Sequence, residues 1–492
     1  MKEAMSAVVN ETKSLLNGDN RLYGTRNSSE CSSEECVPSE SVSVSESFGQ
    51  TTRNRSLSSL QATMHLLKGS IGTGILSTSR AIKLAGLLLG SIGILLLGSL
   101  AAVAMYVLAR CSRVLCKRYQ KTALDYGDVA YEASKRFSEK AAKVFRGVVN
   151  FFLILTQLGF CSTYVLFISE HLVKILQACN VSLNSLHMSS NNVMTLCLVL
   201  PLILTSLVRS LDKLSFLSLA ANVVLLFGMC FIWYFTVSHL NLSERRFGGP
   251  LKDLPLVAPA SGWPLFFGIV VSSFESIGVV LPTENKIKHP QAFRNVFLVS
   301  TAITIGINVA TATLGYMCFG DKTKAMLTLN LPSSGSGSWI NTVVQVFFVF
   351  TTYVTFLIEF YVAMTIIEPP VFRWVKKWQP ESKLVMISYT IRVGCVILLV
   401  AAVLAIPRLT LFIPLAGSIG GATLAFVFPA IIFLLTFTAD LIHERRYVTA
   451  AVLSSCAILT MVIGLVGSIF GLYFSIKDIV AFYDNGRKVE VL

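Results

Sequence analysis

Two short polar stretches, both able to bind a solute, interrupt apolar segments that lie far apart in this sequence. The first, Gly69-Ser-Ile-Gly-Thr-Gly74, holds three glycines in six residues, and each glycine costs a helix about 1 kcal/mol relative to alanine. The second, Ser272-Ser-Phe-Glu-Ser-Ile-Gly278, places a carboxylate, Glu275, inside an apolar segment. Unwound backbone at membrane depth persists only where it lines a protein cavity. The pair therefore predicts a solute site near the bilayer midplane.

The backbone ends at such breaks suit a zwitterion. Amides and the positive dipole end near Thr73 and Gly74 can hold a carboxylate, while carbonyls around Lys68–Ser70 and Ser272–Phe274 can accept an ammonium group. The alternative is that small residues permit close helix packing, but paired breaks favour a site. The expected solute-binding residues are Ser70, Ile71, Gly72, Thr73, Gly74, Ser273, Phe274 and Ser276.

Ionisable side chains lie beside both breaks. His65 stands one turn before the first break, and imidazole is the side chain that titrates near physiological pH. Because ionisable groups inside a membrane are usually functional, we expect His65 and Glu275 to carry coupling protons. Lys68 is the expected counter-charge, and Glu359 is expected to matter less than Glu275. The alternative for His65 is a neutral packing histidine.

The composition predicts an all-α polytopic membrane protein. Hydrophobic residues make up 53% of the 492 residues, only 14% are charged, and the mean hydropathy is +0.67, whereas a soluble protein carries about a quarter charged residues. Spans 1–5 and 6–10 would form two inverted halves, with span 11 appended and spans 1 and 6 broken. The eleven apolar stretches with nearly the ~20 residues needed to span are 61–86, 87–109, 148–169, 193–208, 214–237, 263–283, 296–319, 339–367, 384–406, 411–438 and 448–474.

The net charge of +14 indicates topology rather than a nucleic-acid partner. Basic residues concentrate in the loops after even-numbered spans, which the positive-inside rule places in the cytosol. We therefore expect a cytosolic N-terminus and a non-cytosolic C-terminus. The sequons at Asn180 and Asn241 then fall in outer loops, where glycosylation is possible.

Three parts are expected along the chain: a disordered cytosolic tail at 1–59, rich in Ser and Glu, an eleven-helix domain at 60–475, and a short non-cytosolic tail at 476–492. In the first tail, Glu11, Leu15 and Leu16 form an acidic dileucine pattern that predicts recognition by sorting adaptors and endolysosomal residence. The alternative is a chance match and residence in the plasma membrane.

Enzyme chemistry has no support in the sequence. It shows no nucleophile–base pair, phosphate-cradling loop or zinc spacing, and its eleven cysteines form no metal pattern. We expect no enzyme activity, metal or cofactor, with protons as the coupling ion and the lipid bilayer as the surroundings.

The sequence resembles the proton-coupled amino acid transporter family, within the amino acid/auxin permease group. This likeness implies the leucine-transporter fold, symport of protons with small neutral amino acids of the glycine, alanine and proline class, and an essential histidine at His65. The matching stretches run in order through residues 60–475: 65–74, 125–128, 156–161, 255–259, 274–275, 281–286, 329–332 and 406–408.

Departures from the family pattern keep other functions open. Ser77-Thr-Ser-Arg80 stands where members usually have Gly-Leu-Pro, and Ser276 replaces a glycine. Members also bridge two outer-loop cysteines; here Cys179 is available, but 333–338 holds no cysteine. The alternatives are an amino acid sensor with little flux at an endolysosomal membrane, and a uniporter or exchanger for another organic solute.

Overall fold

The computed structural model describes most of the chain as helix. The expectations for the N-terminal tail with its dileucine pattern, for Asn180 and Asn241, and for Glu275 and Ser276 fall outside the described residues. Those residues are 57–179, 181, 189–208, 211–240, 254–274, 277–332, 338–378, 383–443, 445 and 447–490.

The first span is broken into two helices, α2 (Ser59–Ser70) and α3 (Gly74–Ala85). Ser58 begins α2 with a capping box, because its Oγ accepts from Gln61 N at 3.3 Å and its own N–H donates to Gln61 Oε1 at 2.9 Å. The sixth span is broken in the same way, into α9 (Trp263–Ser273) and α10 (Ile277–Lys286). Both breaks lie at the positions that the glycine and serine pattern indicates.

The remaining spans are long helices, with one exception. Nine helices in the described part of the chain are long and apolar enough to cross a membrane, while α7, of 17 residues, is shorter and the first span is divided between two 12-residue helices. A total of eleven spans therefore remains a prediction. The helices are α4 (Leu87–Arg118), α6 (Glu139–Ala178), α7 (Ser190–Ser206), α8 (Leu211–Ser238), α11 (Phe293–Phe319), α12 (Ser338–Val375), α13 (Leu384–Ala405) and α17 (Tyr447–Glu490).

The tenth span, 409–438, is irregular. It begins as α14 (Leu409–Ala416), passes through π-helical turns at Gly417–Gly421 and Thr423–Val427, and continues as α15 (Phe428–Phe433). A third π-helical turn at Leu434–Thr438 precedes the short α16 (Ala439–His443). Such turns replace the ordinary helical hydrogen bonds and often mark functional sites.

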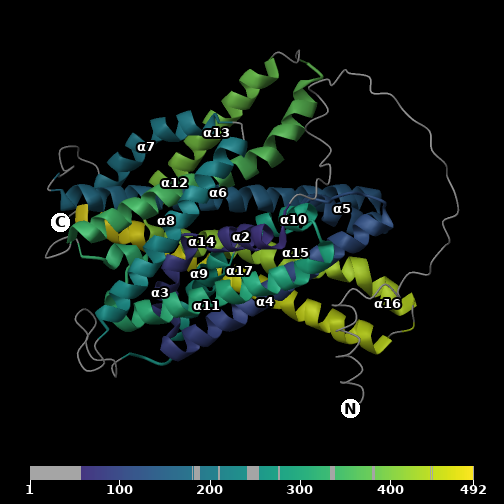
Figure 1. The fold of residues 1–492 in the computed structure, drawn as a ribbon, viewed down its shortest axis with the longest axis horizontal. Coiled ribbons are helices and arrows are strands. Elements are labelled where there is room, and N and C mark those ends of the chain that lie inside the picture. The colour runs from purple at the N-terminus through teal and green to yellow at the C-terminus, as the bar shows by residue number, and fades with distance from the viewer. Residues whose placement is uncertain are drawn as a thin grey trace.

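The broken helices lie between two groups of long helices. Figure 1 shows α4 and α11 on one side, α7, α12 and α13 on the other, and α2, α9 and α14 between them. The contacts agree, because α3 packs on α9 and α11, α14 packs on α9, and α6 packs on α12, α13 and α14. The sequence thus places its two breaks at the centre of the helix assembly.

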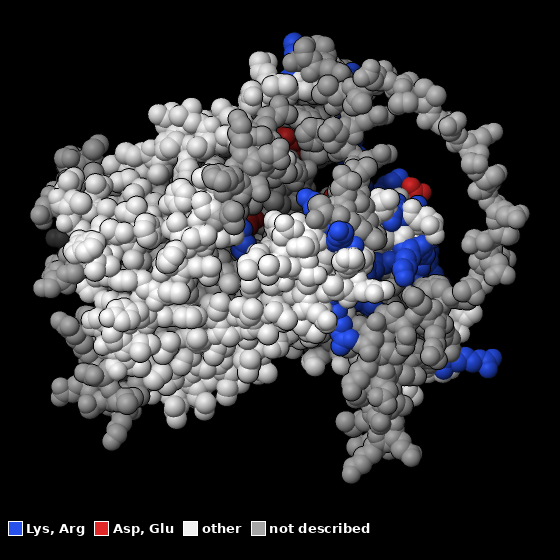
Figure 2. Space-filling view, in the orientation of Figure 1, with Lys and Arg blue, Asp and Glu red and all other residues white. Residues whose placement is uncertain are grey.

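Charged residues gather at one end of the molecule. Figure 2 shows Lys and Arg concentrated where α5 (Tyr126–Lys135), α10 and α16 lie, whereas the opposite part of the visible face is almost without them. Ion pairs link the helices at this end. Arg113 of α4 pairs with Glu284 of α10, and both Arg118 and Arg136 pair with Asp440 of α16.

A buried ion pair and its hydrogen bonds join the helices α7, α12 and α13. Arg392 Nε of α13 donates to Glu368 Oε1 of α12 at 2.8 Å, and the two side chains are 4% and 3% exposed. Ser388 Oγ donates to the same oxygen at 2.8 Å, and Arg392 Nη1 donates to the Ser206 carbonyl at the end of α7 at 2.9 Å. The network fixes α7, α12 and α13 against one another.

Removing Glu368 should destabilise this group of helices. Glu368→Ala leaves the Arg392 guanidinium buried without its counter-charge, which typically costs about 3–5 kcal/mol. The thermal midpoint of the purified protein should fall clearly. Glu139, which forms an exposed ion pair with Lys143, serves as a control. An equal fall of the thermal midpoint in Glu368→Ala and Glu139→Ala would show that the buried pair stabilises the protein no more than an exposed one.

Candidate functional site

The two helix breaks meet at Gly74. A Cβ atom on this residue would lie 3.0 Å from Ser273 Cα and 3.2 Å from the Ser272 carbonyl oxygen. Backbone therefore faces backbone across the crossing, and any larger residue at this position would crowd the Ser272–Ser273 backbone. As a result, the start of α3 and the end of α9 present their free backbone groups to the same place.

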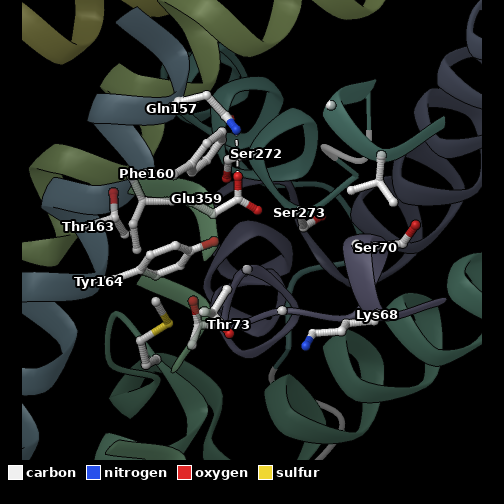
Figure 3. Close-up of a pocket in the computed structure, with 18 residues that line it drawn as sticks. Lys68, Ser70, Thr73, Gln157, Phe160, Thr163, Tyr164, Ser272, Ser273 and Glu359 are labelled. Carbon is white, nitrogen blue, oxygen red and sulfur yellow. Dashed lines mark hydrogen bonds between the residues drawn. The ribbon is translucent and has the colours of Figure 1, made fainter. Parts of the chain in front are cut away.

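A cavity of about 60 Å³ lies at this crossing. Residues from both breaks, from α6 and from α12 line it, as Figure 3 shows. Its lining residues are Lys68, Gly69, Ser70, Gly72, Thr73, Gly74, Gln157, Phe160, Thr163, Tyr164, Ser272, Ser273, Gly278, Val279, Met326, Thr355, Glu359 and Ile413.

The structure brings together five of the expected solute-binding residues and places three expected residues elsewhere. Ser70, Gly72, Thr73, Gly74 and Ser273 line the cavity. Ile71 and Phe274 are buried and are not among the lining residues. The Phe274 ring packs on α4, where its tip would be 2.6 Å from a Cβ on Gly98. His65 also stays outside the lining, with an exposed side chain one turn before the break.

Helix α6 contributes one face that the sequence did not single out. Gln157, Phe160, Thr163 and Tyr164 follow helical spacing and all point into the cavity (Figure 3). The only available signal was the family-like stretch 156–161, which contains Gln157 and Phe160. An unbroken amphipathic helix does not show in its sequence which face meets a solute.

Glu359 and Lys68 give the cavity opposite charges. Gln157 Nε2 donates to Glu359 Oε2 at 2.5 Å, which orients the carboxylate. Among the described residues, the buried Lys68 Nζ has no hydrogen-bond partner, and Figure 3 places it across the cavity from Gln157 and Glu359. A buried ammonium without a partner is costly, so this position is suited to receive an anionic group. We expected Glu359 to be secondary, but it occupies the cavity itself.

A loop held by α6 borders the cavity. Met326 lines the cavity, and the 3-10 turn Leu327–Asn330 follows it directly. His171 Nε2 lies 2.7 Å from Thr328 Oγ1, and Lys174 Nζ donates to the Leu331 carbonyl at 2.6 Å. Two side chains of one helix thus hold the loop next to the cavity.

The broken spans, their crossing and the enclosed charged cavity define a multi-pass membrane transporter. Residues 55–477 match the sequence model of the family described as transmembrane amino acid transporter protein, and the chain belongs to this family. Its members are transporters rather than enzymes, as expected, and their substrates are amino acids.

Two relatives agree with this assignment, and one solved structure shares the fold. The chain is 29% identical to the proton-coupled amino acid transporter-like protein pathetic of Drosophila melanogaster, over 89% of this chain and 88% of that protein. It is 27% identical to the probable amino acid transporter skat-1 of Caenorhabditis elegans, over 85% and 90%. The inward-facing conformation of Mhp1 matches with a TM-score of 0.54 at 12% identity, covering 91% of this chain and 96% of that one. This match confirms the leucine-transporter-like fold.

Proposed function

We propose that this protein transports small neutral amino acids together with protons, by alternating access. The observation that carries the proposal is the cavity at the crossing of the two breaks, with Lys68 and Glu359 in its wall. Uptake of glycine, alanine and proline into proteoliposomes, with and without a proton gradient, tests it.

The charges of the site fit the two ends of an amino acid. The substrate carboxylate would bind at the start of α3, between the Gly72–Gly74 amides and the Lys68 ammonium. The substrate ammonium would bind the carbonyls at the ends of α2 and α9, together with the Glu359 carboxylate. Because both charges are provided for, a zwitterion enters without leaving either Lys68 or Glu359 unpaired.

The size of the cavity favours small substrates. A buried water needs about 10–15 Å³ of cavity volume. The 60 Å³ cavity therefore holds roughly four to six atoms, each about the size of a water molecule. That is the scale of glycine or alanine. The rings of Phe160 and Tyr164 in the lining would exclude a large side chain from this state of the cavity.

Proton coupling rests on His65 and on a carboxylate in the site. The relative from Drosophila melanogaster is named as proton-coupled, and an imidazole changes charge between pH 5 and 8. In this proposal His65, exposed one turn from the cavity, exchanges protons with water, and substrate binding beside Lys68 shifts its protonation. Glu275, in the span-6 break, stays a second candidate for this role.

Replacing His65 should separate transport from its pH dependence. His65→Ala is expected to reach the membrane and to lose the stimulation of uptake by acidic external pH, because His65 is the only histidine of α2. His289→Ala, which removes an exposed histidine outside the spans, is the matched control and should keep the stimulation. A wild-type pH profile in His65→Ala would remove this residue from the coupling mechanism.

A further inference from the structure

Met326 reaches the cavity at the crossing of the breaks from outside the membrane spans. The other described residues of the lining belong to the two broken spans, to α6, to α12 or to α14, whereas Met326 lies in the segment between α11 and α12. Its side chain is fully buried, at 0% exposure. Because segments between helices are normally mobile and lie at the surface, a cavity wall made from such a segment needs supports of its own.

One face of α6 runs from the cavity to these supports. Tyr164 lines the cavity, and Phe167, His171 and Lys174 follow at intervals of three or four residues, which places all four on the same face of the helix. The buried ring of Phe167 stacks on the His171 imidazole, with 3.8 Å between the centroids. The stack therefore holds the imidazole in place about 10 Å along the helix from Tyr164.

The His171 imidazole fixes the residue two positions after Met326. Its Nδ1 lies 2.8 Å from the Phe167 carbonyl, which can only accept, so Nδ1 must carry a proton. In the neutral imidazole the other nitrogen, Nε2, then accepts from the Thr328 hydroxyl at 2.7 Å. Thr328 is itself fully buried, so the loss of this bond would leave a buried hydroxyl unpaired.

Two more side chains hold the backbone on both sides of Met326. After it, Lys174 Nζ donates to three backbone carbonyls within 328–331, at 2.6–3.5 Å. Before it, the backbone amide of Lys324 donates to Asn330 Oδ1 at 2.9 Å, which closes the segment on itself. The position of the Met326 backbone is therefore set by α6 and by the segment's own hydrogen bonds.

Met326 lies toward the end of the cavity that is away from its carboxylate. Gln157, which orients Glu359, precedes Tyr164 by about 10 Å along α6, whereas the supports of Met326 begin at His171, a similar distance beyond Tyr164. In the proposed amino acid transport, Glu359 and the helix ends bind the charged groups of the substrate. The substrate side chain is then left to point toward Met326.

We propose that Met326 determines which amino acid side chains the site accepts, with His171 and Lys174 as the positioning residues that fix it. The inference rests on the proposed transport and names its selectivity determinant. An unbranched thioether adapts its shape to small neighbours, so it packs against glycine, alanine or proline. Leucine needs the space that the methionine occupies, and the fixed backbone on both sides keeps the methionine from withdrawing.

Competition for bound radiolabelled alanine measures this selectivity in purified protein. Leucine should compete far more weakly than glycine or alanine in the wild type. Met326→Ala should raise the affinity for leucine relative to alanine about tenfold or more, as expected for added space in an apolar pocket, and the milder Met326→Val should give a smaller rise. Met326→Leu, which conserves volume, should keep the wild-type ranking. Met364→Ala truncates an equally buried methionine outside the lining and should also keep it.

A double-mutant cycle tests the positioning role. Lys174→Met removes the hydrogen bonds to 328–331 and should raise the leucine-to-alanine affinity ratio several-fold, while Lys174→Arg should restore the wild-type ratio. In the Met326→Ala background, Lys174→Met should leave the ratio unchanged, because its effect passes through Met326. An equal loss of affinity for every amino acid in Lys174→Met would show a merely structural role and overturn the positioning.

Two results separate this inference from the transport proposal. If the wild type binds alanine but Met326→Ala keeps its ranking of amino acids, or Met364→Ala shows the same change in ranking, the assignment of Met326 is overturned and the transport proposal stands. If none of these amino acids binds to the wild type, the transport proposal is overturned and this inference with it.

Discussion

Replacing Glu359 by glutamine is expected to abolish amino acid uptake while leaving the protein folded. The substitution keeps the shape of the side chain and its contact with Gln157, but it removes the negative charge opposite Lys68. A hydrogen bond to a charged group contributes about 1.5–3 kcal/mol, so substrate affinity should fall roughly tenfold to more than a hundredfold. Binding of radiolabelled alanine and its uptake measure the two losses separately.

The controls for this result are carboxylates outside the cavity. Glu139→Gln, at an exposed position, should transport normally. The comparison with Glu275→Gln is also informative, because the sequence favoured Glu275 as the coupling carboxylate. Normal uptake by Glu359→Gln together with complete loss in Glu275→Gln would return that role to span 6 and contradict the position given to Glu359.

Gly72→Val should abolish substrate binding through a different mechanism. Gly72 lines the cavity, and a Cβ atom on it would have no atom within 4 Å. The valine side chain can therefore be accommodated without a clash in the fold, but it projects into a cavity of about 60 Å³ and takes the place of the solute. Expression and elution from a sizing column should match the wild type, whereas substrate-induced thermal stabilisation should be lost.

Substitutions at two other glycines distinguish a loss of substrate binding from a general disturbance of the fold. Gly147→Val also meets open space, on the exposed end of α6, and should bind substrate normally. Gly74→Val meets the backbone of Ser272 and Ser273 and should disturb the crossing of the helices as well as binding. Unchanged affinity in Gly72→Val would mean that the glycines of the first break serve packing alone.

The sequence predicts the breaks well because their cause is local. Clustered glycines and serines weaken a regular helix, so the breaks within 69–74 and 272–278 could be located from residue types, and family membership follows from the order of short stretches. The direction of individual side chains is not local. Ile71 and Phe274 belong to the breaks but pack away from the cavity, because unwound backbone has no fixed period that tells one face from another.

The partners across the site were equally hard to predict. Gln157 and Glu359 are 202 residues apart in the sequence and meet only because α6 packs on α12. The pairing of Glu368 with Arg392 likewise depends on how α12 packs against α13.

Proton-driven uptake into proteoliposomes tests the central claim most directly. Protein reconstituted with radiolabelled glycine, alanine or proline outside should accumulate the amino acid when the interior is alkaline, and accumulation should collapse when a proton carrier dissipates the gradient. Glu359→Gln and Gly72→Val vesicles should show neither effect. Substrate binding without flux would indicate a sensor, and flux that ignores the proton gradient would indicate a uniporter or exchanger; either result would contradict proton-coupled amino acid transport.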